Sequence, residues 1–338
     1  MKKNIVEDFD YIYILGIGGA SMSCIANFFL WKEKNVFGYD QTKSENTFDL
    51  EKQLVEINYI DEVGFIPKKI LDNKKNSLII YTSCLGNNNP ENSKIFSFLK
   101  SENFVLKKRS DFFYDLSKDK FTIALAGTHG KTSTISLLTH ILISNQKKIV
   151  SFVGAKVINY QKNFITNAKK DEDYIVLIEA DEYDNFFLSL NYDLATISTC
   201  DPDHLDFFLS KENFEKSFLE FISKNENKVF LNEKVYEVLN LKKIEKKNIF
   251  KYGFSSSCDV FIKNYFIENF IYKCEIEVKS KKLSFRFKSN MIGEHQIENL
   301  AAILSICSEL ELNENQIQNS LNSYLGVYRR SQIIKKNS

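Results

Sequence analysis

The sequence lacks an excess of either charge, and it lacks any long apolar run. Its 45 Lys and Arg residues balance 44 Asp and Glu residues, which gives a formal net charge of +1. A chain with so little net charge has no global attraction to nucleic acid or to an anionic membrane. No apolar run approaches the roughly 18 residues of a membrane span, and the opening MKKNIVED contains no apolar leader segment. We therefore expect a cytoplasmic protein with no nucleic acid partner and no membrane partner.

Paired cysteines are also missing. The six cysteines lie far apart, with no C-x-x-C pair and no cluster of histidine and cysteine at the spacing of a metal site. This pattern excludes the common zinc and dithiol motifs, and it favours free thiols, most of them buried, in a reducing compartment. What is present is the composition of a globular chain: 338 residues, 43% hydrophobic and 26% charged, enough for about two domains.

The first region alternates apolar runs with helix-length polar segments. A helix is expected at Met22–Trp31, and strands are expected at Tyr11–Leu15, Asn35–Tyr39, Ser77–Thr82 and Phe104–Leu106. Such alternation predicts a parallel sheet with helices between its strands. A polar segment then precedes a new strand, so we place a Rossmann-like domain at residues 1–117.

The second region continues this alternation and then changes. After an apolar run that breaks at Gly127, strands are expected at Ile149–Val153, Tyr174–Ile178, Leu194–Thr199 and Lys228–Leu231. Between residues 248 and 288, short alternating runs predict antiparallel strands. Two helices follow, at about His295–Leu310 and Glu314–Tyr324. We therefore predict an α/β fold throughout, with a central domain at residues 118–330 that is of the phosphate-loop ATPase type and carries an added antiparallel sheet.

The run AGTHGKT, which ends at Thr132, has the features of a nucleotide phosphate loop. Backbone N–H groups of a glycine turn at a helix N-terminus can bind phosphate. A lysine after the turn reaches the outer phosphates, and the next hydroxyl can ligate Mg²⁺. Gly127, Gly130, Lys131 and Thr132 fit these roles, although the full motif has a glycine where this chain has Leu125. The structural alternative is a strand-to-helix turn with an incidental Gly-Lys pair.

Acidic residues and a histidine follow two further strands. One strand runs into the acidic segment E-A-D-E that begins at Glu179, and the next runs into D-P-D-H, which ends at His204. Ligands of open α/β sheets bind at the carboxyl ends of strands, so Thr132, Glu179 and His204 could surround Mg²⁺. Histidine is an unusual ligand for so hard a cation. The structural alternatives are that Glu179 caps a helix and that His204 is a satisfied polar residue beside Asp206.

Five segments, in this order along nearly the whole chain, resemble the Mur ligases. They are AGTHGKT (126–132), EADEYD (179–184), DH (203–204), GEHQIEN (293–299) and GVYRR (326–330). Members of that family use ATP to join an amino acid to a carboxylate of a UDP-linked cell-wall precursor, and their phosphate loop has the same shortened form. The resemblance therefore implies an ATP- and Mg²⁺-dependent ligase of peptidoglycan precursor synthesis.

The glycine-rich turn GIGGASM, which ends at Met22, indicates which members of the Mur ligase family this chain resembles most. It is similar to the turn of members that join L-alanine to UDP-N-acetylmuramate, whereas the members that recycle murein peptides usually have Gly-Ile-Cys-Gly there and remain an alternative. The resemblance implies a UDP-sugar site formed by Gly16, Gly18, Gly19, Ser21, Asp40 and Ser83.

Taken alone, the same turn also fits a dinucleotide-binding dehydrogenase. In that fingerprint, G-x-G-x-x-G, the last glycine is Ser21 in this chain, and an acidic residue follows about 20 residues later, here Asp40. A hydride-transfer enzyme would leave the second phosphate loop unexplained, so we favour the ligase hypothesis.

The resemblance also implies roles in the ATP site. ATP would phosphorylate the lactyl carboxylate, and the amine of L-alanine would then attack the acyl phosphate. Lys131 would serve the β- and γ-phosphates, while His295 and Asn299 would border the adenine. Without the resemblance, helix capping and surface packing would explain His295 and Asn299. The catalytic residues would be Lys131, His204 and Arg330, and the ATP-binding residues would be Gly127, Thr128, His129, Gly130, Lys131, Thr132, Ser133, His295, Asn299 and Arg330.

Two departures from the family pattern affect these expectations. Gln296 stands where the family has asparagine, so one contact near the adenine would change. The resemblance ends at Arg330, and residues 331–338 would only begin the family's third domain, which binds the amino acid. We expect either that this domain is supplied, by a separate chain or by a reading frame that continues, or that the protein binds the UDP-sugar and ATP without completing the bond.

Overall fold

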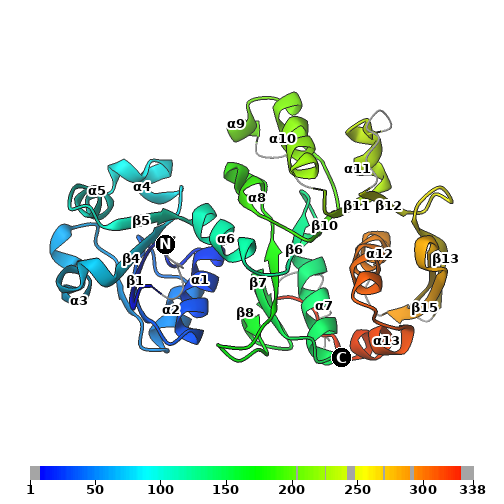
Figure 1. Ribbon diagram of the computed structural model, residues 1–338, viewed down its shortest axis with the longest axis horizontal. Coiled ribbons are helices and arrows are strands. Elements are labelled where there is room, and N and C mark those ends of the chain that lie inside the picture. The colour runs from blue at the N-terminus through cyan, green and yellow to red at the C-terminus, as the bar shows by residue number, and fades with distance from the viewer. Residues whose placement is uncertain are drawn as a thin grey trace, which may run out of the picture. The chain divides into compact units, whose positions relative to one another are not determined.

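The computed structural model describes residues 8–202, 205–224, 226–241, 248–268, 271–289 and 293–328. The chain forms two compact units (Figure 1). Unit 1 contains the residues up to Asp119 together with Lys169–Glu172, and unit 2 contains Lys120–Ala168 and the residues from Asp173 onward. Within the described ranges, no helix combines the length and the apolar character that a membrane span needs.

Unit 1 is built on a five-stranded parallel sheet in the order β3-β2-β1-β4-β5. Its strands are β1 (Tyr11–Leu15), β2 (Asn35–Tyr39), β3 (Glu56–Asn58), β4 (Ser77–Tyr81) and β5 (Val105–Lys108). Its longer helices are α1 (Ala20–Trp31), α2 (Glu45–Glu51), α3 (Lys68–Asp72), α5 (Lys94–Ser101) and α6 (Arg109–Lys118), with a short α4 (Leu85–Asn88) after β4. Apolar side chains from both the strands and the helices are buried, as a sheet covered by helices requires.

Unit 2 is built on one ten-stranded sheet in the order β15-β14-β13-β12-β11-β10-β6-β9-β7-β8. The strands that lead to the phosphate loop and its neighbours are β6 (Thr122–Ala126), β7 (Ile149–Val157), β8 (Lys162–Thr166), β9 (Ile175–Glu179), β10 (Leu194–Ile197) and β11 (Lys228–Asn232). The remaining strands are β12 (Ile249–Gly253), β13 (Val260–Glu268), β14 (Ile271–Val278) and β15 (Leu283–Ser289). The central strands β10, β6, β9 and β7 are parallel, so their carboxyl ends meet at one edge of the sheet.

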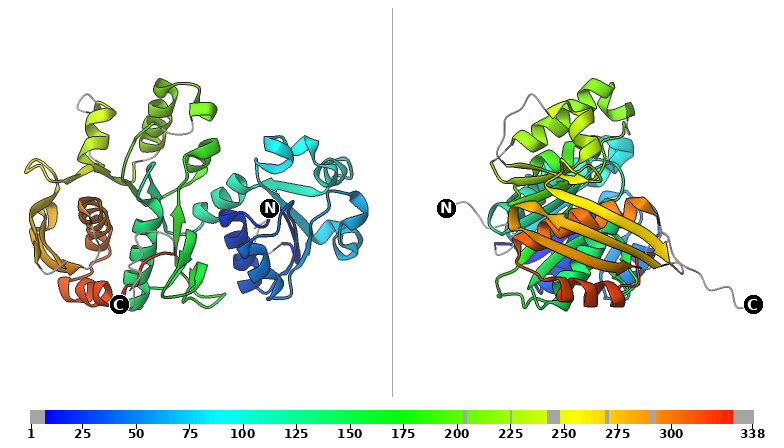
Figure 2. Two further views of the ribbon diagram at one scale, coloured as in Figure 1. Left: turned by 180° about the vertical axis from the view of Figure 1, so that it is seen from behind. Right: turned by 90° about the vertical axis from the view of Figure 1, so that its right-hand side faces the viewer.

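Unit 2 also contains helices, and several of them pack against this sheet. The helices are α7 (Lys131–Ser144), α8 (Phe186–Ser189), α9 (Leu205–Phe208), α10 (Lys211–Ser223), α11 (Glu233–Val238), α12 (Glu294–Glu309) and α13 (Glu314–Ser323). One hydrophobic core joins α7 and α12 to the sheet. In Figure 2 the long strands β13–β15 lie against α12 and α13. The outer edge of β15 is covered, because the amide of Lys288 donates to Gln318 of α13 at 2.8 Å.

The fold class predicted from the sequence agrees with this α/β architecture, and β1 and β2 have the predicted bounds. One prediction for residues 248–288 was wrong. The first strand of that segment, β12, runs parallel to both of its neighbours, and antiparallel pairing begins only between β13 and β14. Alternation of apolar residues reports which face of a strand is buried and carries no information about strand direction. The added strands also continue the central sheet instead of forming a separate one.

Candidate active site

The phosphate loop joins β6 to α7 through two glycines with positive φ angles. Gly127 has φ 121° and Gly130 has φ 85°, a region that residues with a Cβ rarely adopt. Space is also restricted, because a Cβ at Gly127 would lie 2.4 Å from Ser198 Oγ, and a Cβ at Gly130 would lie 2.8 Å from Asn299 Oδ1. Both positions therefore require glycine, as the motif predicts.

The middle of the loop is hydrogen-bonded to the residues that follow β10. The amide of Thr128 donates to the carbonyl of Thr199 at 3.2 Å, and the amide of His129 donates to Thr199 Oγ1 at 2.8 Å. In the described part of the chain, the amides of residues 130–133, at the start of α7, have no acceptor within the protein. These amides, with the partial positive charge of the helix N-terminus, form the anion-binding part of the loop.

Thr132 and Glu179 are brought together as the sequence predicts. Thr132 Oγ1 donates to Glu179 Oε1 at 2.7 Å, and the amide of Gly154 in β7 donates to Glu179 Oε2 at 2.7 Å. Thr132 is buried, and Glu179 ends β9, the strand beside β6. The two side chains present a hydroxyl and a carboxylate oxygen next to the phosphate loop.

Lys131 is paired with a carboxylate that the sequence did not assign to it. Its Nζ lies 2.6 Å from Glu182 Oε2 and 3.9 Å from Asp181 Oδ1. The side chain of Glu182 is only 1% exposed and that of Lys131 is 12% exposed, so this is a buried ion pair at the end of β9. Such a pair is stable only while both partners are present, because each charge alone would lose its solvation without compensation.

The start of α12 also reaches the loop. Asn299 is buried, and its Oδ1 is the atom that limits the space at Gly130. Gln296 is buried beside it, with its Nε2 3.2 Å from Nε2 of the exposed His295. His204 and Arg330 lie outside the described residues, so their predicted roles stay predictions.

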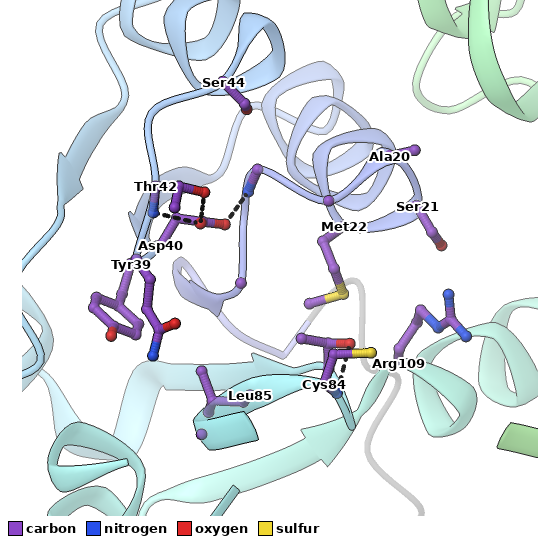
Figure 3. A pocket seen from close by; sticks show the side chains of 16 residues that line it. Ala20, Ser21, Met22, Tyr39, Asp40, Thr42, Ser44, Cys84, Leu85 and Arg109 are labelled. Atoms are coloured by element: carbon purple, nitrogen blue, oxygen red, sulfur yellow. Dashed lines mark hydrogen bonds between the residues drawn. The ribbon is translucent and has the colours of Figure 1, made fainter. Parts of the chain in front are cut away.

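Unit 1 contains a pocket of about 460 Å³ at the carboxyl ends of its strands (Figure 3). Of the predicted UDP-sugar residues, Gly16, Gly18, Gly19, Ser21 and Asp40 line it. Ser83 does not, although its neighbours Thr82 and Cys84 do.

Asp40 holds the glycine-rich turn in place. Its Oδ2 accepts from the amide of Gly18 at 2.7 Å, and its Oδ1 accepts from the amide of Thr42 at 3.0 Å. The amides of Gly16 and Gly19 donate to backbone carbonyls of the protein. The three glycine amides therefore donate to acceptors inside unit 1. The first residues of α1 (Ala20, Ser21 and Met22) also line the pocket, so the N-terminus of this helix lies at the pocket wall.

Residues 125–307 of the chain match the Mur ligase middle domain. The chain belongs to the Mur ligase family. A UDP-N-acetylmuramate–L-alanine ligase from Christiangramia forsetii is 34% identical over 329 residues, which cover 96% of this chain and 69% of that protein. The enzyme described here is thus a Mur ligase, a class of ATP-dependent ligases that act in peptidoglycan synthesis.

Solved structures of Mur ligases have the same fold. The UDP-N-acetylmuramate-alanine ligase of Thermotoga maritima aligns with a TM-score of 0.79 at 22% identity, covering 97% of this chain and 71% of that one. The UDP-N-acetylmuramate:L-alanyl-gamma-D-glutamyl-meso-diaminopimelate ligase of Neisseria meningitides aligns with a TM-score of 0.80 at 17% identity, covering 95% of this chain and 100% of that one. At these identities the two structures support the architecture alone.

Three residues of this Mur ligase were not predicted as functional. Gly154 fixes the Glu179 carboxylate, and Glu182 pairs with Lys131. Arg109, the first residue of α6, lines the pocket of unit 1 together with Ser21 and Cys84 (Figure 3). Glu182 belongs to the EADEYD motif, which is visible in the sequence. No sequence pattern connects Gly154 to the phosphate loop or Arg109 to the pocket of unit 1.

Proposed function

We propose that this Mur ligase joins L-alanine to the lactyl carboxylate of UDP-N-acetylmuramate, using ATP. The observation that carries this proposal is the group formed by Lys131, Thr132 and Glu179 at the carboxyl ends of β6 and β9. Such a group is suited to hold the terminal phosphates of a nucleotide. The identity of the substrates rests on the 34% identical relative, which carries that activity in its name.

The reaction must activate a carboxylate, because a carboxylate does not react with an amine at neutral pH. A carboxylate oxygen attacks the γ-phosphorus of ATP, the bond to the β-phosphate oxygen breaks, and an acyl phosphate and ADP form. The neutral amine of alanine then attacks the acyl carbon, and the tetrahedral intermediate expels inorganic phosphate as the nitrogen loses a proton. Lys131 stabilises the charge on the transferring phosphoryl group, with His204 and Arg330 as the further catalytic residues.

The oxygen atoms beside the loop fit a magnesium ion. Mg²⁺ is usually bound by one or two carboxylates together with phosphate oxygens and water. Thr132 Oγ1 and Glu179 Oε1 lie 2.7 Å apart and supply a hydroxyl and a carboxylate oxygen. His204 is the proposed third ligand. When bound, the ion neutralises part of the phosphate charge, and the protein residues orient the phosphate chain.

The pocket of unit 1 holds the sugar nucleotide in this proposal. The N-terminus of α1 and the guanidinium of Arg109 supply positive charge for the diphosphate. Asp40 acts by fixing the turn from which α1 starts. In this organisation residues 1–117 hold the UDP-sugar and residues 118–330 hold ATP.

The test is release of inorganic phosphate from ATP in the presence of UDP-N-acetylmuramate, with and without L-alanine. The assay uses this chain alone and then with the C-terminal part of the Christiangramia forsetii ligase added as a separate polypeptide. We expect alanine-dependent release that falls at least about 100-fold in Lys131→Ala, because one transition-state charge contact is lost. Release that never depends on alanine would overturn the proposal, and dependence on a muropeptide instead would indicate a recycling ligase.

A further inference from the structure

The buried ion pair between Lys131 and Glu182 affects how a nucleotide enters the phosphate loop. The lysine is the residue expected to meet the outer phosphates, yet its ammonium already donates to Glu182 Oε2 at 2.6 Å. Asp181 adds a second carboxylate at 3.9 Å. A phosphate oxygen that approaches Lys131 therefore also approaches the negative charge of Glu182.

The backbone fixes Glu182 in this position. The turn that follows it contains Asp184 at φ 58° and Asn185 at φ 53°, two consecutive residues in the left-handed region. Residues other than glycine hold that conformation only where the surrounding structure imposes it. Here the amide of Asn185 donates to the carbonyl of Glu182 at 3.0 Å.

Beyond the turn, an aromatic core anchors the same segment. Phe187 is fully buried, and its ring stacks on Phe221 of α10 with 5.0 Å between the ring centroids. The amide of Phe187 donates to the carbonyl of Asp181 at 3.0 Å. The turn and the aromatic core therefore fix the position of Glu182, so a ligand cannot displace it as easily as a mobile surface carboxylate.

The charges around the loop favour a particular form of nucleotide. Lys131 contributes one positive charge, whereas Glu179, Asp181 and Glu182 contribute three negative charges within the described part of this region. A buried carboxylate is poorly screened by salt, so its repulsion of a polyphosphate persists at ordinary ionic strength. A divalent cation beside Thr132 and Glu179 would reverse that balance.

We propose that Glu182 masks the charge of Lys131, so that the loop accepts a nucleotide as its magnesium complex and rejects the free polyanion. This inference rests on the proposed ATP-binding function of the loop. Lys131 keeps its contact with Glu182 during binding, because an ammonium has three N–H donors and needs only one for the carboxylate. Glu182 is therefore a positioning residue that acts through Lys131.

The test measures the dissociation constant of ATP by isothermal titration calorimetry, once with excess Mg²⁺ and once with EDTA. Glu182→Gln keeps the shape and one oxygen acceptor but removes the charge. We expect this variant to bind ATP in EDTA about 10-fold more tightly than the wild type, while binding with Mg²⁺ changes less than about 3-fold. Asp181→Asn is the matched control, because it removes one charge from the neighbouring, more exposed residue, and it should change both constants less than about 3-fold.

The outcomes separate this inference from the proposed function. If the wild type binds ATP with Mg²⁺ and Glu182→Gln gains nothing in EDTA, the masking role is wrong and the ATP site stands. If Glu182→Gln weakens binding under both conditions, Glu182 only aligns or stabilises Lys131, and masking is again wrong. If neither protein binds ATP with Mg²⁺, the proposed function fails, and the inference fails with it. A gain in EDTA by a variant with an unchanged thermal midpoint supports masking, because a purely structural role cannot strengthen binding.

Discussion

Thr132 Oγ1 donates a hydrogen bond to Glu179 Oε1 at 2.7 Å, and the second oxygen of the same carboxylate accepts from the amide of Gly154 at 2.7 Å. The carboxylate is therefore held between α7 and β7. A Cβ at Gly154 would lie 2.6 Å from Glu179 Oε2 and 2.8 Å from Oε1. The absence of a side chain at residue 154 is what allows the carboxylate to lie against Thr132.

Gly154→Ala should displace the Glu179 carboxylate and weaken binding of ATP with Mg²⁺ by about 10-fold, which corresponds to about 1.4 kcal/mol. The fold should be little affected, because the new methyl group meets the end of a flexible side chain at an exposed position. Calorimetric titration with ATP and Mg²⁺ measures the change. Gly64→Ala is the control, because a Cβ at Gly64 meets no atom within 4 Å. Equal affinities for both variants would contradict the assigned role of Gly154.

Arg109→Ala should weaken binding of UDP-N-acetylmuramate by about 10- to 100-fold, because a guanidinium contact to a diphosphate is charge-assisted. Arg109→Lys should recover part of this loss, since it keeps the charge but not the planar fork. The dissociation constant of ATP should stay at the wild-type value in both variants, because Arg109 belongs to unit 1 and the phosphate loop to unit 2. A loss of affinity for both ligands, together with a lower thermal midpoint, would instead indicate a role of Arg109 in folding.

Much of the fold could be predicted because its strands are short apolar runs separated by helix-length segments. β6, β9 and β10 were recognisable in this way, and their parallel order follows from the helices that connect them. The direction of β12 was not predictable, because its pairing depends on which neighbour it meets and not on its own residues. The short β8 was missed for a similar reason, since it pairs with β7 only after the chain turns back.

In the candidate site, too, some features could be predicted from the sequence and others could not. Lys131 and Thr132 lie in one contiguous motif, and Glu179 ends a recognisable strand, so the sequence places all three at one edge of the sheet. Gly154 donates to Glu179, and Arg109 lines the same pocket as the glycine-rich turn. Both residues are distant in sequence from these partners, and only the folded sheets bring them together. The partner of Lys131 could not be chosen from the sequence, because Glu179, Asp181 and Glu182 occur within four residues and the turn decides which one faces it.

Cys84 should react with a thiol reagent in the folded protein before any other cysteine does. It is exposed and lines the pocket of unit 1, whereas the other five cysteines are buried. Burial also raises the pKa of Cys200 and of Cys307 to about 12, which keeps these thiols protonated and unreactive. Mass spectrometry after brief alkylation should find one modified cysteine per folded chain and all six after denaturation.

A protection experiment links this reactivity to the proposed site. UDP-N-acetylmuramate should slow alkylation of Cys84, and ATP should not, if the pocket of unit 1 holds the sugar nucleotide. Cys84→Ser identifies the labelled position. This variant should lose the fast reaction of the folded protein, and the number of cysteines modified after denaturation should fall only from six to five. Protection by ATP alone would argue against the assignment of the two ligands to the two units.

His140 should make the folded state less stable in mild acid. It is buried in α7, with Nδ1 2.9 Å from Tyr160 Oη and Nε2 2.8 Å from Ser323 Oγ. Burial lowers the pKa of His140 from its ordinary value of 6.5, so the unfolded chain binds the proton more readily than the folded chain does. The free energy of unfolding therefore decreases as the pH falls through about 6.5, and the full penalty is reached below the lowered pKa of the folded state.

Urea unfolding at about pH 7.5 and about pH 5 measures this difference, and His140→Gln provides the comparison, because glutamine can hydrogen-bond to either hydroxyl but does not titrate. At the higher pH the variant should have a lower free energy of unfolding than the wild type, because the neutral, well-packed imidazole ring is missing. Its further loss on acidification should be smaller than that of the wild type. Carboxylates elsewhere contribute equally to both proteins, so the difference between the two slopes isolates the proton on His140. Identical slopes would mean that the folded protein accommodates the charged ring at no cost, contrary to the burial that the structure assigns to it.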